Sequence, residues 1–215
     1  MTSRLSVNNI EDVKTLTIGD ATAEDTKIVF DGNAQDFHIG LDDSSDSLTI
    51  GLGSTLGTTS HMVFDANGQI TKPLNPAFSV HKNGTDQDDI AEGSHVTITW
   101  STERFDVNSD FASNTFTAPV TGKYLLSLNV RMEQVDDAPN YYVFKIITSN
   151  TEYRHIFDPD FGGDMNYWTV AVNALADMDA NDTAYATFFQ DTSGAVQTDI
   201  DGSEYYTYFS GCLVC

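Results

Sequence analysis

The sequence predicts an all-β protein, and three features support this. Polar and apolar side chains alternate over residues 124–132, with the apolar positions from Leu126 to Met132 on one face. The 215 residues include 13 Phe and 9 Tyr, which favour strands over helices. Apolar stretches of strand length, separated by turns rich in Gly, Asp, Asn and Pro, recur at 141–148, 167–175, 184–190 and 205–214. This number of strands predicts a sandwich of two antiparallel sheets.

The first 75 residues are predicted to form shorter strands. The candidates are Leu16–Ile18, Lys27–Phe30, Phe37–Leu41, Leu48–Leu52 and Met62–Asp65. Leu-Thr-Ile-Gly at 16–19 recurs at 48–51, and the segment 28–35 recurs loosely at 62–69, which indicates a duplicated β-unit. Each unit is too small and polar to bury a core alone, so we expect it to stack on neighbours or pair between chains.

A proline-containing segment divides these short strands from the longer ones. Pro73 and Pro76 cannot continue a hydrogen-bonded ladder, so we predict a boundary at this point. The predicted parts are an N-terminal β-repeat region for attachment or as a stalk, residues 1–75, and a head, residues 76–215.

Charge and hydropathy exclude several classes of function. The chain carries 32 Asp and Glu against 10 Lys and Arg, a formal net charge of −22, and such a surface repels nucleic acid. No apolar run is long enough to span a bilayer, which argues against membrane insertion. Residues 1–6 lack the apolar segment of a secretory signal, so we do not expect export by that route.

Two predicted strands of the head are apolar on both faces. In the strands predicted at 141–148 and 205–214, one face can fill the core. The apolar side chains of the other face must be shielded from water by another subunit or by a loop of the same chain. The candidates for the core or for a trimer interface are Tyr141, Val143, Ile147, Tyr205, Tyr206, Tyr208 and Phe209. Gly211, inside the last strand, indicates a close approach by a neighbouring group.

The head resembles a known family. Phe105-Asp106, then the segment Phe116-Thr-Ala-Pro-Val-Thr-Gly-Lys-Tyr124, and a final Phe209-Ser-Gly-Cys-Leu213 follow the order and spacing found in complement C1q-like globular heads. This resemblance implies a jelly roll of the tumour-necrosis-factor type and a homotrimer that acts as a binding module. The family's collagen stalk is absent, because the chain has no Gly-x-y repeat. The animal immune and hormone roles therefore do not carry over.

A second resemblance concerns residues 15–70. The segments Leu-Thr-Ile-Gly-Asp-Ala-Thr, Thr-Lys-Ile-Val-Phe-Asp-Gly and Phe-His-Ile-Gly-Leu-Asp-Asp look like β-repeats in structural fibre proteins of marine bacteriophages. This resemblance implies a protein made in the host cytoplasm and located in the virion.

The sequence shows no catalytic motif, and we expect no enzymatic activity. The five histidines are scattered, and neither a zinc-protease motif nor a nucleophile elbow is present. We expect no cofactor other than, at most, Ca²⁺, for which Asp158, Asp160 and Asp164 on a Gly-rich loop are the candidate ligands. The acidic segment 177–182 resembles half of an EF-hand loop, but a plain turn is the better interpretation. Cys212 and Cys215 are expected to be free thiols.

The leading hypothesis is a trimeric short fibre of a bacteriophage. Its N-terminal region would bind other virion proteins, and its head would bind a host-surface glycan or protein through three identical copies. One alternative is a capsid decoration or cement protein that uses the same trimer. Another is a soluble bacterial C1q-like lectin, which the missing signal peptide disfavours.

Overall fold

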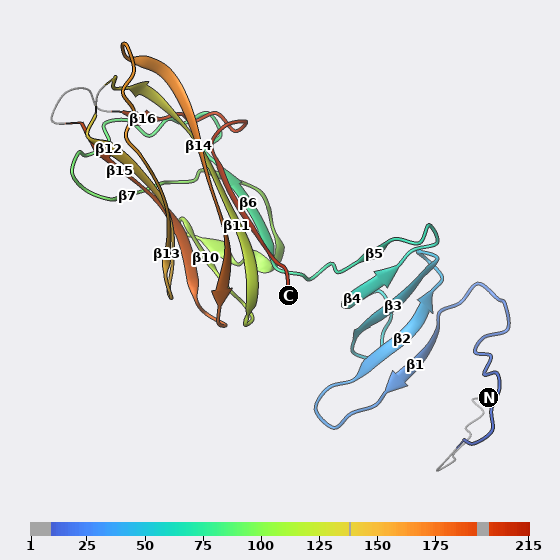
Figure 1. Cartoon of the computed structure of the whole chain (residues 1–215). Helices are drawn as coiled ribbons and strands as arrows, with labels where there is room; N and C mark the ends of the chain where they lie inside the picture. Colours follow the sequence, from blue (N-terminus) through green and yellow to red (C-terminus); the bar gives the residue numbers. More distant parts are fainter. Residues whose placement is uncertain (1–9, 138, 193–197) are drawn as a thin grey trace. The chain divides into compact units, whose positions relative to one another are not determined.

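A computed structural model describes residues 10–137, 139–192 and 198–215. The chain divides into two compact units, Met1–Leu74 and Asn75–Cys215, and each unit is described here by itself. Antiparallel strands dominate both units, as Figure 1 shows. The described part contains no helix long and apolar enough to cross a membrane.

The N-terminal unit is a five-stranded antiparallel meander. Its strands pair in the order β1-β2-β3-β4-β5, and their bounds are Thr26–Phe30, Phe37–Asp42, Ser47–Leu52, Ser60–Phe64 and Ile70–Thr71. Four of the five predicted short strands are therefore present. Leu16–Ile18 is not a strand and is exposed, so the copies at 16–19 and 48–51 are not structurally equivalent. A repeat of four residues does not force a strand where no neighbour pairs with it.

This sheet buries its polar face. The segment 53–59 covers it, since Leu56 is buried and His38 Nδ1 donates a hydrogen bond at 2.9 Å to the carbonyl of Gly53. Only glycine fits at Gly51, because a Cβ there would lie 2.3 Å from the carbonyl oxygen of Thr59. The other buried residues of the face are small or polar: Asp42, Ser47 and Thr49.

The opposite face of the same sheet is apolar and uncovered within the unit. Cross-strand pairs align Ile28 with Ile39, Phe37 with Leu52 and Ile50 with Met62 on one side of the pleat. On β1–β4 this surface has ten large apolar side chains, here called the apolar face: Ile28, Phe30, Phe37, Ile39, Leu41, Leu48, Ile50, Leu52, Met62 and Phe64.

The C-terminal unit is a two-sheet jelly roll, which confirms the predicted fold class. One sheet has the order β13-β12-β15-β10-β9 with β7 paired to β15; the other has β14-β11-β17-β6-β8 with β16 paired to β11. The bounds of the first group are Glu152–Phe157, Tyr141–Thr148, Thr183–Asp191, Thr115–Thr117, Phe111–Ala112 and Val96–Thr97. Those of the second are Met165–Met178, Gly122–Val135, Tyr208–Leu213, Ala77–His81, Thr102–Asp106 and Asp199–Ile200. One short 3₁₀ helix spans Val107–Ser109.

The core lies between these two sheets. The alternation predicted around β11 is confirmed, because Leu126, Leu128, Val130 and Met132 are all fully buried. Phe78 of β6 stacks on Phe111 and Phe116 and meets Phe209 edge-on, with ring centroids 4.7–5.1 Å apart. This aromatic cluster joins strands from both sheets.

Several elements of the head differ from the predictions. The last strand begins at Tyr208, and Tyr205 and Tyr206 lie on a turn before it. Strand β13 was not predicted, because in its sequence Glu-Tyr-Arg-His-Ile-Phe a histidine interrupts the apolar side of Tyr153 and Phe157. Cys212 and Cys215 are free thiols, as expected.

The close approach predicted at Gly211 is confirmed and can be tested. A Cβ at this position would lie 2.7 Å from both Leu126 Cδ2 and Phe78 Cε1. We expect Gly211→Ala to destabilise the unit by about 1–3 kcal/mol, the usual cost of overpacking. Gly162→Ala is the matched control, because no heavy atom lies within 4 Å of its added Cβ. Equal denaturation midpoints for the two variants in guanidinium chloride would contradict this account.

Candidate functional site

The seven residues predicted for the core or an interface divide between these environments. Phe209 is fully buried in the core, between the sheets. The core side of β12 carries its alternate residues, such as Phe144, so Tyr141, Val143 and Ile147 lie on the outer face. Tyr205 is 75 % exposed, Tyr206 is exposed and Tyr208 is partly buried. Whether any of them contacts another subunit stays a prediction.

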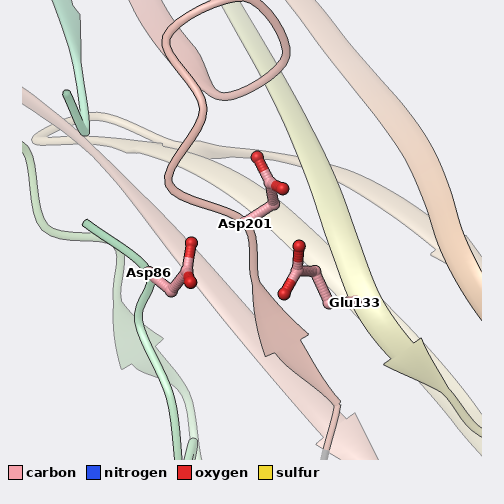
Figure 2. Close-up of side chains that lie close together, drawn as sticks. All are labelled: Asp86, Glu133 and Asp201. Carbon is pink, nitrogen blue, oxygen red and sulfur yellow. The ribbon is translucent and has the colours of Figure 1, made fainter. Parts of the chain in front are cut away.

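Three carboxyl groups converge at one end of the second sheet, as Figure 2 shows. Glu133 comes from β11, Asp201 directly follows β16, and Asp86 lies in the segment after β6. Each offers an oxygen, and these oxygens lie within 4.8 Å of one another. The pairing of β16 with β11 and a 2.6 Å hydrogen bond from the Gly202 amide to Asp86 Oδ1 bring the three segments together.

Neighbouring groups compensate most of this negative charge. The guanidinium of Arg131 donates to Asp201 Oδ2, and the amide of Ser203 donates to Asp201 Oδ1 at 2.7 Å. Arg131 is itself held between two aromatic rings, at 4.0 Å from the centroid of Tyr206 and 4.4 Å from that of Tyr167. The turn that carries Tyr206 therefore positions the cation that faces the buried carboxylate.

The remaining charge is relieved by a proton. The hydrogen bond to Asp201, burial and the charge of Asp201 raise the pKa of Glu133 to about 7. Burial alone would raise the pKa of Asp201, but the hydrogen bonds from Glu133 and Arg131 lower it. Glu133 thus holds a proton near neutral pH and donates it to the Asp201 carboxylate.

Calcium does not fit this cluster well. The ion takes six to eight oxygen ligands, and both oxygens of Asp201 already accept hydrogen bonds from Arg131 and Ser203. Asp86 also accepts from a backbone amide. The cluster is satisfied by one guanidinium, backbone amides and one proton, and we do not assign a metal to it.

A second group of carboxyls includes one predicted calcium ligand. Asp164 lies with Asp136 and Asp137, again with oxygens within 4.8 Å, and the Asp137 amide donates to Asp164 Oδ1 at 3.2 Å. The structure does not bring Asp158 and Asp160 into this group, and both are exposed. Sequence reasoning missed Asp136 and Asp137, because they lie 27 residues or more from Asp164 and nothing in their spacing signals the contact.

Comparisons with known proteins give a likeness to a solved structure and no family. No protein-family model matches the chain, and no curated protein matches it. Among solved structures, the globular domain of the zebrafish complement 1qA protein is similar at 19 % identity and a TM-score of 0.44. The match covers 66 % of this chain and 98 % of that one. The jelly-roll assignment rests on the strand order of the C-terminal unit itself.

The protonated Glu133 makes stability depend on pH. Its folded-state pKa exceeds the value of about 4.3 for an unfolded Glu, so its contribution is complete below that pH and is lost as pH rises through about 7. Glu133→Gln keeps a donor at every pH. In chelator at pH 8 we expect this variant to melt about 3 °C or more above the parent chain, and the gap to close near pH 5.

Glu103→Gln is the control for that comparison, because Glu103 is an exposed carboxylate on β8 outside the cluster. Asp201, whose pKa is lowered, changes its charge below this pH window. A melting-temperature difference between Glu133→Gln and the parent that stays constant from pH 5 to 8 would contradict the shared proton.

Calcium binding stays a prediction and is now tied to specific residues. If the ion binds, we expect it at the group of Asp136, Asp137 and Asp164, so Asp164→Asn should weaken calcium binding about tenfold in calorimetric titration. Asp158→Asn, outside the group, should leave the affinity unchanged. No heat with the parent chain, together with a melting temperature insensitive to chelator, would refute the prediction.

Proposed function

We propose that the protein is a non-enzymatic surface protein of a bacteriophage virion. It acts as a homotrimeric short fibre, with the N-terminal unit for trimer formation and attachment and the jelly roll for contact with the host surface. The single observation that carries this proposal is the apolar face of the N-terminal sheet. The resemblance of residues 15–70 to phage fibre repeats and that of the head to C1q-like trimers support it.

The apolar face is unfavourable in an isolated chain. Ile28, Phe30 and Leu41 are 43 %, 55 % and 47 % exposed, on a sheet whose buried side is polar. Each such side chain gains roughly 1.5–3 kcal/mol when it moves from water into an apolar contact. A contiguous surface of ten large apolar residues is typical of an interface. The face therefore needs a cover.

The apolar face of another copy of this chain is the surface that would pack on it most favourably. The face carries no charged side chain on β1–β4 and one hydroxyl, that of Thr26 opposite Leu41, so it offers little to a polar partner. Three single-layer sheets can turn their apolar faces toward a common axis and enclose a shared core, with the polar faces and the segments 53–59 outside. Closed rotational symmetry of this kind leaves no apolar face unpaired.

The head contributes the binding surfaces of the fibre. Its loops and outer sheet faces are presented three times in the trimer, so weak contacts to a repeated host-surface component add up to strong attachment. A capsid decoration role would use the same trimer at another place on the particle. Location of the protein in a virion reconstruction separates the two roles.

The trimer can be tested with two neighbouring residues of β1. Ile28 lies on the apolar face and Val29 on the opposite one, and their exposed fractions are similar, 43 % and 37 %. By light scattering at micromolar concentration we expect the parent chain and Val29→Asp to have three times the chain mass of 23.6 kDa. Ile28→Asp should be monomeric, because a carboxylate would be buried in the shared core.

A monomeric parent chain would refute the homotrimer and would point to another virion protein as the cover. Trimer loss in both variants would show that β1 acts through its fold and not through the apolar face. Circular dichroism of the variants checks that the strands remain formed.

A further inference from the structure

A hollow lies on the outer face of the first head sheet. Residues of β12, β13 and β15 line it, together with His95 from the segment before β7. Its volume is about 390 Å³, within the range of roughly 300–1,000 Å³ that small-ligand sites occupy. The hollow lies on the first head sheet, whereas the cluster of Asp86, Glu133 and Asp201 lies at the second. The hollow and the cluster therefore share no residues.

One wall of the hollow is aromatic. The rings of Tyr141 and Phe189 are nearly parallel, with an interplanar angle of 18° and centroids 5.4 Å apart, and His95 lies 5.0 Å from Phe189. Val143 and Ile156 complete the apolar lining. Stacked rings with an accessible face suit a ligand that has a flat apolar side, such as the C–H face of a sugar ring.

The other wall is cationic. Lys145 of β12 and Arg154 of β13 are direct cross-strand neighbours, and both bind the single carboxylate of Glu152, Lys145 Nζ at 2.9 Å from Oε2. Two positive charges thus share one negative charge, which leaves a positive surplus in a chain of net charge −22. Burial and the charges of Lys145 and Arg154 also lower the pKa of His95, as expected beside a positive site.

A hydroxyl group next to these cations lacks a partner. Thr187 pairs with Lys145 across the β12–β15 ladder, so both side chains lie on the outer face. Thr187 is only 3 % exposed, and its Oγ1 has no hydrogen-bond partner within the described part of the chain. Buried hydroxyls are normally paired, but Thr187 does not line the hollow, so we assign its hydroxyl no contact with a ligand there.

We propose that this hollow binds one acidic sugar residue of a surface polysaccharide. The sugar ring packs on Tyr141 and Phe189, and its carboxylate or sulfate faces Lys145 and Arg154. This inference deepens the host-binding role proposed above and rests on it for the source of the glycan. An acidic peptide fits less well, because its further charges would extend over the surrounding acidic surface.

The first test compares sugars that differ in one group. We would titrate the intact chain with glucuronic acid, glucose 6-sulfate and glucose, and follow the resonances of Tyr141, His95 and Phe189 by NMR. At least one of the acidic sugars should shift these resonances in a saturable way. We expect its affinity to be at least about tenfold above that of glucose, which is the usual effect of one charge-assisted hydrogen bond. The acidic sugar that binds more tightly shows whether the polysaccharide carries carboxylates or sulfates.

The second test assigns the contacts with variants outside the core. Arg154→Gln should reduce affinity for the acidic sugar about tenfold and leave that for glucose unchanged, whereas Tyr141→Ala should weaken both sugars. The matched controls are Lys123→Gln, an exposed cation on β11, and Tyr205→Ala, an exposed tyrosine on the last turn. Neither control should alter binding.

Several results would overturn the inference. These are equal binding of glucose and the acidic sugars, no saturable shift with any of them, unchanged affinity in Arg154→Gln, or stronger binding of a poly-glutamate peptide. Binding by the Ile28→Asp monomer but not by the parent trimer would show that another subunit covers the hollow, which also overturns it. A trimeric parent that binds no sugar refutes only this inference, whereas a monomeric parent that binds one refutes only the proposed trimer.

Discussion

The head depends on the alternation of side chains along strand β11. This strand runs from Gly122 to Val135 and pairs with β14 on one side and with β17 and β16 on the other. Its inward residues fill the core, and the same two-residue period places Arg131 and Glu133 on the outer surface. A one-residue shift of register would bury the guanidinium and expose Leu128. Core packing and the geometry of the acidic cluster are therefore set by one strand.

The two units use the alternation in opposite ways. In the head, the apolar faces of two sheets meet, and the outward faces mix polar residues with apolar ones such as Val143 and Leu125. In the N-terminal unit, the polar face is covered by the chain's own segment 53–59, and the apolar face is the open one. Gly40 and Gly51 make this possible, because a Cβ at either position would lie 2.3–2.7 Å from backbone and side-chain atoms that cross the sheet.

Sequence patterns could predict the parts of the structure that repeat locally. The period of two around Leu126–Met132 and the turn residues depend on near neighbours in the chain, and the structure agrees with them. Gly211 indicated a close approach, but the sequence could not identify its distant partners Phe78 and Leu126. The acidic cluster could not be predicted, because Asp86, Glu133 and Asp201 are separated by 47 and 68 residues and meet through the pairing of β16 with β11 and the hydrogen bond from the Gly202 amide to Asp86. The hollow beside Lys145 could not be predicted either, because its lining residues come from segments that are far apart in the sequence. Tyr141 and Val143 were predicted as core or interface residues, but their cationic neighbour Arg154 lies on β13, a strand that the sequence did not predict.

The uneven charge of the head also affects how a ligand arrives. A chain of net charge −22 repels an approaching anion within a few Debye lengths of its surface, whereas the surplus charge beside Glu152 attracts it only at contact. Dissolved salt screens the distant repulsion more than the partly buried contact. An anionic ligand would therefore reach the head faster in concentrated electrolyte than in dilute buffer, the reverse of ordinary electrostatic steering. Such a surface works best in salty water.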